Sequence, residues 1–185
     1  MKTQNKLVVA GILLNQEINH LGRFGRRVIN QPSKTVVIAG GAKVSDKINV
    51  LKQFVQAGVK AIFIGGKMVN TFLIAQKAKT KMIPFKLSDI PRTLLSSSEE
   101  NNQNLVNEVS LAGEILDFAN DKKVNLIFPD DYKCVDEFKA PTFFIESEPD
   151  FEKVLQLDLG PKTIDNFKNT ILSNGIENVF WNGPL

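Results

Sequence analysis

One stretch decides the fold of this chain: Val36-Val37-Ile38-Ala39-Gly40-Gly41-Ala42-Lys43-Val44-Ser45-Asp46-Lys47-Ile48. Its first four residues are apolar and mostly β-branched, which is typical of a strand buried on both faces. The glycine pair predicts a turn. The apolar side chains that follow have helical spacing and predict a helix over residues 45–57: Ile48, Leu51, Phe54 and Val55.

A turn between a buried strand and a helix is a favourable place for an anion. Unpaired backbone N–H groups and the helix dipole both attract negative charge there. Lys43 and Lys47 are four residues apart, so on a helix about one turn would separate these two cations. The sequence matches neither the Walker A nor the G-x-G-x-x-G pattern. The residues alone therefore leave two interpretations open, phosphate binding or tight helix packing beside two solvated lysines.

The remainder of the chain alternates between strand and helix patterns. This alternation predicts an α/β fold: a three-layer, Rossmann-like parallel sheet with helices on both faces. A ligand site is then expected at the carboxyl ends of the strands. The polar stretch 77–104 is interpreted as a surface excursion. The predicted strands are 35–39, 61–64, 126–128 and 179–181, and the predicted helices are 10–27, 45–57, 68–78, 103–120 and 162–173.

Composition favours a small intracellular domain. With 185 residues and 43% hydrophobic content, the chain can bury one core. A net charge of +3 spread along the sequence predicts no nucleic-acid partner. Cys134 is the only cysteine, which excludes an internal disulfide and fits a reducing cytosol. Neither a long apolar run nor a secretory signal is apparent, so we expect no membrane contact and a cytoplasmic location.

Several motifs resemble those of one known family. The stretch from Gly40 to Ile48 resembles the G-G-A-K-V-[SA]-D-K-I signature of phosphoglycerate kinases. Four further segments resemble motifs of that family in the same order: Phe63 to Leu73 (I-G-G-G-M-A-x-T-F-L), Phe128 to Phe138 (L-P-V-D…A-D-[EK]-F), Leu157 to Thr163 (L-D-[IC]-G-P-K-T) and Trp181 to Pro184 (W-N-G-P).

The resemblance implies a phosphotransferase of glycolysis. In that family the acyl phosphate of 1,3-bisphosphoglycerate passes to ADP, giving ATP and 3-phosphoglycerate, with Mg²⁺ accompanying the nucleotide. By the motif match, Lys47 would meet the nucleotide phosphates and Lys43 would lie beside the transferring group. The nucleotide-binding positions implied by the match are Gly41, Ala42, Gly65, Gly66, Phe138, Leu157, Asn182 and Pro184.

The resemblance covers only part of the family's carboxyl-terminal, nucleotide-binding lobe. Residues 1–30 would form an interdomain-type helix and residues 31–185 a partial nucleotide-binding domain. We therefore expect a monomeric fragment that is inactive alone, holds no magnesium ligand and meets 3-phosphoglycerate only through an amino-terminal lobe. The sequence departs from the motifs at three positions: Lys67 replaces a third glycine and concerns base recognition, whereas Gln156, in place of another glycine, and Asp130, in place of an apolar residue, concern how fully the site is preserved.

Two other functions are compatible with the sequence. The chain could be a non-catalytic nucleotide-binding remnant, or a split-gene half that works with a separately encoded lobe. It could instead be a basic RNA-binding module that uses Arg23, Arg26 and Arg27. A more ordinary explanation is that these arginines lie in solvent at the carboxyl end of a helix, where positive charge interacts favourably with the helix dipole.

Overall fold

The computed structural model describes residues 11–80, 98–135, 143–146, 155–173 and 175–185. Its centre is a four-stranded sheet in the order β3-β2-β1-β7, and every pair is parallel. All five residues of β1 are buried, as their β-branched apolar pattern predicts. The four strands are β1 (Thr35–Ala39), β2 (Ala61–Ile64), β3 (Asn125–Ile127) and β7 (Asn178–Asn182).

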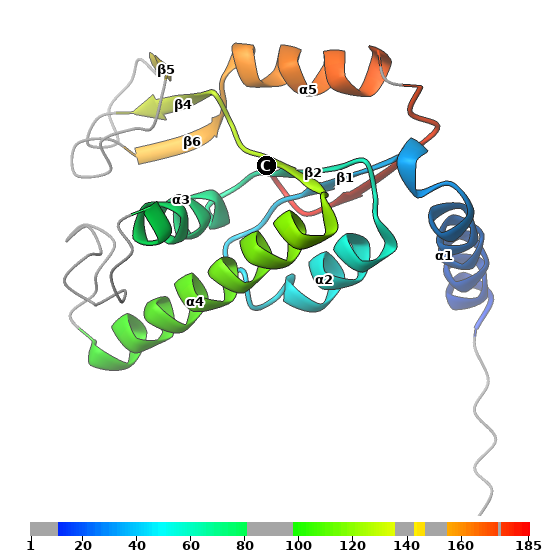
Figure 1. Cartoon of the computed structure of the whole chain (residues 1–185), viewed down its shortest axis with the longest axis horizontal. Coiled ribbons are helices and arrows are strands. Elements are labelled where there is room, and N and C mark those ends of the chain that lie inside the picture. Colours follow the sequence, from blue (N-terminus) through cyan, green and yellow to red (C-terminus); the bar gives the residue numbers. More distant parts are fainter. Residues whose placement is uncertain (1–10, 81–97, 136–142, 147–154, 174) are drawn as a thin grey trace, which may run out of the picture.

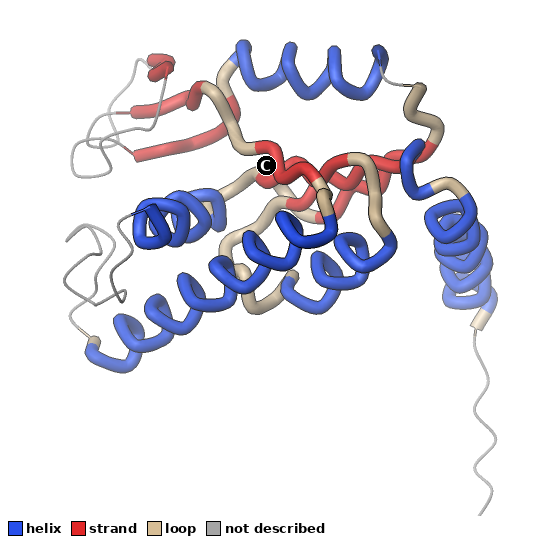
Figure 2. The backbone as a smooth tube through the Cα atoms, in the orientation of Figure 1, coloured by secondary structure: helices blue, strands red, loops and turns tan. Residues whose placement is uncertain are grey.

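Helices cover both faces of this sheet (Figures 1 and 2). One core joins Val37 and Ile62 of the sheet to side chains of the helices below it in Figure 1. The other core joins Val36 and Phe63 to Phe167 of α5, on the opposite face. This confirms the predicted α/β class with its helix–sheet–helix layers. The helices are α1 (Ile12–Asn30), α2 (Ile48–Ala57), α3 (Met68–Thr80), α4 (Glu99–Lys122) and α5 (Pro161–Ser173), with a short 3₁₀ turn η1 (Pro32–Lys34).

A second, antiparallel sheet was not predicted from the sequence. Its order is β5-β4-β6, and β4 pairs with both neighbours. The alternation in Leu155-Gln156-Leu157-Asp158-Leu159 is the signal that could have identified one of its strands. The three strands are β4 (Asp131–Val135), β5 (Phe143–Glu146) and β6 (Leu155–Leu159).

Two helix starts differ from the prediction. The helix predicted over 45–57 begins only at Ile48, because the chain from Ser45 to Lys47 forms a turn. In the opposite sense, α4 begins at Glu99, inside the stretch interpreted as a surface excursion. Ser98 caps this helix by accepting a hydrogen bond from the Asn101 N–H. The acidic residues in the first turn, Glu99 and Glu100, interact favourably with the helix dipole.

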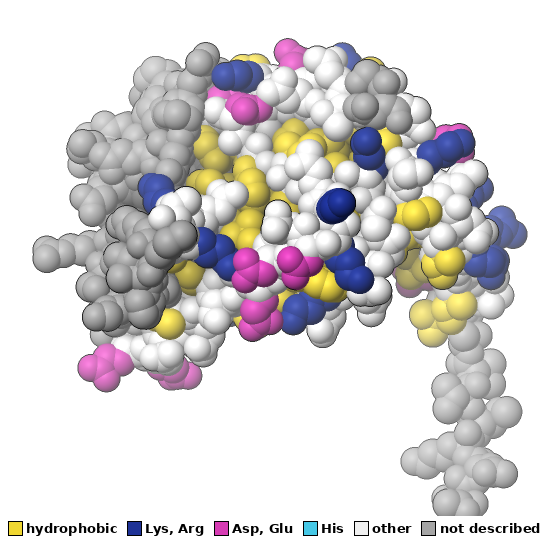
Figure 3. Space-filling view, in the orientation of Figure 1, with side chains coloured by type: hydrophobic (Ala, Val, Ile, Leu, Met, Phe, Trp, Pro, Cys, Tyr) yellow, Lys and Arg dark blue, Asp and Glu magenta, His cyan; other side chains and the backbone are white. Residues whose placement is uncertain are grey.

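Helix α1 lies along one side of the molecule with much of its apolar surface uncovered (Figures 1 and 3). Phe24 attaches it by packing on Phe54 of α2 and Phe180 of β7, with ring centroids 6.4 and 5.3 Å away. Its apolar residues Ile12, Leu13, Leu14 and Leu21 are 83, 76, 51 and 58% exposed. Among the described helices, none is long and apolar enough to cross a membrane.

Candidate functional site at the carboxyl edge of the sheet

Three glycine-containing turns meet where β1, β2 and β7 end. The Gly40 N–H donates to the Asn182 carbonyl at 2.9 Å, and the Gly65 N–H donates to the Ala39 carbonyl at 2.9 Å. The Met68 N–H donates to the Gly41 carbonyl at 3.0 Å, which joins the first turn to the start of α3. The parallel pairing of the three strands therefore brings the predicted turns together at one edge.

Glycine is required at this edge because the turns approach each other closely. A Cβ on Gly66 would lie 2.7 Å from the Gly41 nitrogen and 2.9 Å from the Pro184 carbonyl oxygen. A Cβ on Gly40 would overlap that same carbonyl oxygen. Gly41 and Gly66 also have φ of +142° and +67°, which side chains rarely adopt. The backbone is thus packed too tightly here for any larger residue.

Lys47 reaches across the edge to the end of β7. Its Nζ donates a hydrogen bond to Oδ1 of Asn182, and its Cε lies 3.4 Å from the position of a Cβ on Gly41. Lys47 is half-buried and directly precedes α2, where its backbone N–H donates to the Val44 carbonyl. The structure therefore brings together Lys47, Gly41 and Asn182.

Lys43 occupies a different setting. It is exposed, and its side chain makes no hydrogen bond or ion pair with the described part of the chain. The prediction that Lys43 and Lys47 are separated by one turn of a helix is wrong, because both precede α2 in the turn. Ala42, between the glycines and Lys43, is also exposed. Within the described part of the chain, Lys43 is thus an unpaired cation in the segment that leads from β1 to α2.

The surface beside Gly65 is covered by the end of the described chain. A Cβ on Gly65 would overlap the Leu185 side chain, and Leu185 packs on the core beneath α5. Pro184 is exposed. Of the two expected apolar contacts for a base, Leu157 is 47% exposed on β6, so it is not a core residue. Phe138 lies outside the described residues.

Asp131, a carboxylate that could by type bind a metal, instead anchors α5. Its oxygens accept hydrogen bonds from the Thr163 N–H at 2.7 Å, the Thr163 hydroxyl at 2.6 Å and the Lys162 N–H at 3.0 Å. Burial alone would raise the pKa of Asp131, but these hydrogen bonds and the Lys162 charge hold it below its ordinary value. Gly160 is needed because a Cβ there would overlap this carboxylate.

Asp130 and Cys134 also have structural explanations. The Asp130 carboxylate accepts a hydrogen bond from the Asn166 amide of α5. Cys134 is fully buried, and burial raises the pKa of its thiol, which keeps it neutral.

Sequence reasoning missed the role of Asp131 because its partner Thr163 is 32 residues away in the chain. Within the described residues, no group of three or more His, Cys, Asp or Glu side chains could hold a metal ion.

Fold and site together define an α/β protein with a glycine-lined, lysine-bearing edge suited to phosphate groups. The sequence profile described as phosphoglycerate kinase matches residues 1–185, and the chain belongs to that family. A phosphoglycerate kinase of Anaeromyxobacter dehalogenans is 35% identical over 179 residues, covering 95% of this chain and 39% of the relative. One from Lactobacillus delbrueckii subsp. lactis is 37% identical over 188 residues, covering 100% of this chain and 39% of the relative.

Solved structures of phosphoglycerate kinases also match this chain over part of their length. The phosphoglycerate kinase of Coxiella burnetii superposes with a TM-score of 0.66 at 26% identity, covering 95% of this chain and 39% of that one. The enzyme of Pyrococcus horikoshii OT3 superposes with a TM-score of 0.64 at 23% identity, covering 94% and 39%, which supports the fold alone. The chain thus spans about two fifths of the length of these relatives.

Proposed function

We propose that the carboxyl edge of the sheet binds the phosphates of ADP or ATP and serves a phosphoglycerate kinase reaction. That reaction transfers the acyl phosphate of 1,3-bisphosphoglycerate to ADP, giving ATP and 3-phosphoglycerate, within glycolysis. The observation that carries the proposal is the contact of Lys47 with Asn182 across the glycine turns. A cytoplasmic location belongs to the same proposal.

The two lysines would have separate tasks. Phosphoryl transfer needs positioning and positive charge against the oxygens of the moving group more than covalent help. Asn182 holds Lys47 over the backbone, where its ammonium would meet the nucleotide phosphates. Lys43 is exposed and free to reach the transferring group. Magnesium would enter with the substrate as MgADP.

Base recognition would use the glycine turn after β2. Gly65 and Gly66 have no side chain of their own to occupy the space for a base, and the exposed Leu157 offers apolar surface. Lys67 follows directly and is exposed, so its stem does not fill the turn. Because Leu185 lies against Gly65, we propose that a base displaces the Leu185 side chain as it binds.

Turnover would require more surface than this chain provides. The 3-phosphoglycerate site has no counterpart among the motifs here, and catalysis in such kinases depends on closure of two lobes that excludes water. The uncovered apolar residues of α1 supply a surface on which an amino-terminal lobe could pack. We propose that the chain binds nucleotide alone and is catalytically inactive without that lobe.

The test is calorimetric titration of MgADP into the folded chain. We expect a dissociation constant of about 1 mM, or roughly −4 kcal/mol. Lys47→Ala should abolish measurable binding, whereas Lys52→Ala should leave it unchanged. Lys52 is the matched control because it lies on α2 and pairs with Glu114, away from the edge. Absence of binding to a folded chain, or equal loss in both variants, would overturn the proposal.

A further inference from the structure

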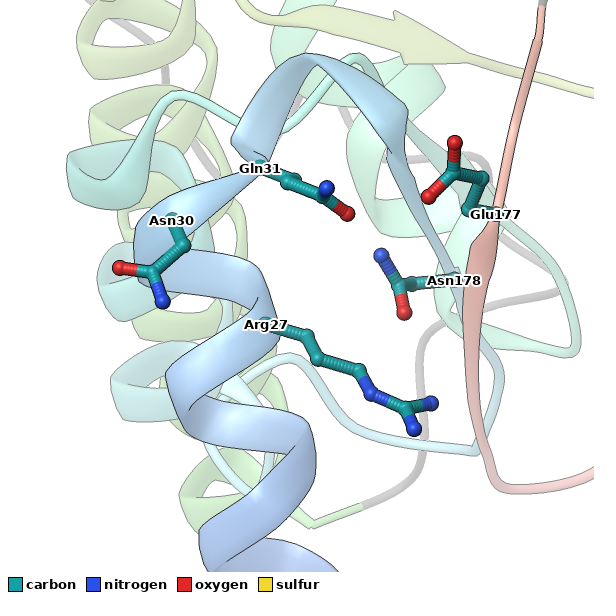
Figure 4. Close-up of a pocket in the computed structure, with 5 residues that line it drawn as sticks. All are labelled: Arg27, Asn30, Gln31, Glu177 and Asn178. Carbon is teal, nitrogen blue, oxygen red and sulfur yellow. The ribbon is translucent and has the colours of Figure 1, made fainter.

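A separate pocket lies between the end of α1 and the start of β7, at the opposite edge of the sheet (Figure 4). It is an open depression of about 400 Å³, lined by Arg27, Asn30, Gln31, Glu177 and Asn178. Every lining residue carries a polar or charged side chain. Such a lining is not that of an apolar packing defect, and the volume falls in the range of small-molecule sites.

Asn178 is the buried polar group of this pocket. The residue is 5% exposed, and its amide nitrogen has no hydrogen-bond partner. A buried donor left without a partner destabilises the folded state. Figure 4 shows the Asn178 side chain directed from β7 into the space facing Gln31, which directly follows α1. The wall of the pocket therefore holds a buried donor that lacks an acceptor.

Arg27 supplies a cation to the same space. Its guanidinium extends from the last turn of α1 toward Asn178 (Figure 4). The Arg27 side chain makes no hydrogen bond or ion pair with any described residue. The one acid of the pocket, Glu177, is already paired with Lys34, whose Nζ lies 2.5 Å from the carboxylate. The charge that remains uncompensated is therefore the positive charge of Arg27.

We infer that this pocket binds the oxyanion group, carboxylate or phosphate, of a small metabolite. A planar guanidinium can donate two parallel hydrogen bonds to either group. The Asn178 amide nitrogen, which points toward Gln31 in Figure 4, would donate a further hydrogen bond to a ligand oxygen that enters between these two side chains. The site is independent of the proposed nucleotide edge, because Asn178 and Asn182 stand at opposite ends of β7.

The experiment follows the Asn178 side-chain amide by NMR in ¹⁵N-labelled protein. Inorganic phosphate and succinate are titrated separately, with ionic strength held constant by sodium chloride. We expect the Asn178 amide signals to shift saturably with at least one anion, at about millimolar concentration. A response to phosphate alone identifies a phosphate ligand, and a response to succinate alone identifies a carboxylate ligand. Because phosphate can also bind near Lys47, only the signal at Asn178 reports on this pocket.

Two arginine variants complete the test. Arg27→Gln should weaken binding at Asn178 by about tenfold, because it removes a charge-assisted hydrogen bond. Arg26→Gln removes the same charge from the neighbouring exposed residue, which does not line the pocket, and should leave binding unchanged. Both positions are exposed, so the fold should persist. Asn178 signals that do not move with either anion, or equal weakening in both variants, would overturn the inference.

Discussion

Lys47 and Asn182 are 135 residues apart in the chain, yet the lysine ammonium donates a hydrogen bond to the asparagine side-chain oxygen. Asn182 lies at the end of β7, which pairs with β1 and so stands beside the turn that carries Lys47. The neutral amide holds the lysine without neutralising its charge, whereas a carboxylate would neutralise it. A positioned but uncompensated cation is suited to an incoming phosphate.

Asn182→Ala should weaken MgADP binding less than Lys47→Ala does. The lysine keeps its charge in this variant but loses the group that orients it, so we expect a change of about fivefold, near 1 kcal/mol. Calorimetry on both variants and on the double variant checks this. If the changes in binding free energy of the two single variants sum to that of the double variant, the prediction is contradicted, because two residues that act as a unit have non-additive effects.

Gly40→Ala should destabilise the chain by about 2 kcal/mol or more, because the new methyl group would overlap the Pro184 carbonyl oxygen. Urea unfolding measures this change. The matched control is Gly22→Ala on α1, where a Cβ would meet nothing within 4 Å. The control should be neutral or stabilising by about 0.5–1 kcal/mol, since alanine favours helix. Similar losses in both variants would contradict the close approach.

Asp131→Asn should lower stability at pH 7 by about 1–3 kcal/mol, because the charged acceptor of three hydrogen bonds is lost. The folded-state pKa of Asp131 lies below its unfolded value, so its stabilisation is present above about pH 4 and is lost as pH falls through the folded pKa. The variant should therefore show a flatter acid dependence below pH 4. Urea unfolding across this range is the measurement.

The control for Asp131 is Asp121→Asn, an exposed residue near the end of α4. Its removal should change the free energy of unfolding by less than about 0.5 kcal/mol. If the two variants have the same acid dependence, the effect does not come from the cap of α5.

Phe24→Ala should release α1 from the remainder of the chain. The ring is the contact of α1 with both Phe54 and Phe180, so its loss removes the aromatic attachment. Hydrogen exchange should show reduced protection of α1 amides while β1 stays protected. Leu13→Ala is the control, since Leu13 is 76% exposed and should leave protection unchanged. Uniform loss of protection over α1 and β1 would contradict local release.

Mixing the chain with the separately produced amino-terminal lobe of a related phosphoglycerate kinase should restore turnover. The exposed apolar residues of α1 would be covered in that complex, so Leu21→Asp should prevent recovery. Arg23→Gln, an exposed change on the same helix, should permit it. A coupled assay measures turnover. Activity of the unmixed chain would contradict the need for the lobe.

The sequence predicts most of the parallel sheet because its signals are local. The apolar run before Gly40 specifies β1, and the periodic segment 103–120 specifies most of α4. The turn from Ser45 to Lys47 was mistaken for helix because apolar spacing does not mark the first helical residue. Ser98 and the acidic residues after it form a recognisable N-terminal signal for α4, which the spacing of apolar residues does not reveal.

The sequence motifs locate the residues of the candidate site but not the contacts between them. Gly41 and Lys47 lie in a single recognisable string, but the contact of Lys47 with Asn182 depends on β1 pairing with β7. Asp131 and the buried Asn178 have no local signal, because their environments come from distant segments. Non-local packing of this kind cannot be inferred from composition or periodicity.

The pairing of β1 with β7 also fixes when the edge can assemble during synthesis. Lys34 and Glu177, which flank the amino ends of these strands, are 143 residues apart. At a translation rate of about 5–20 residues per second, β1 and its glycine turn wait roughly 7 to 29 seconds for β7. Until then the Lys47 side chain has no Asn182 to hold it. The contact that holds Lys47 can therefore form only after Asn182 has been synthesised, later than the helices that precede β7 in the chain.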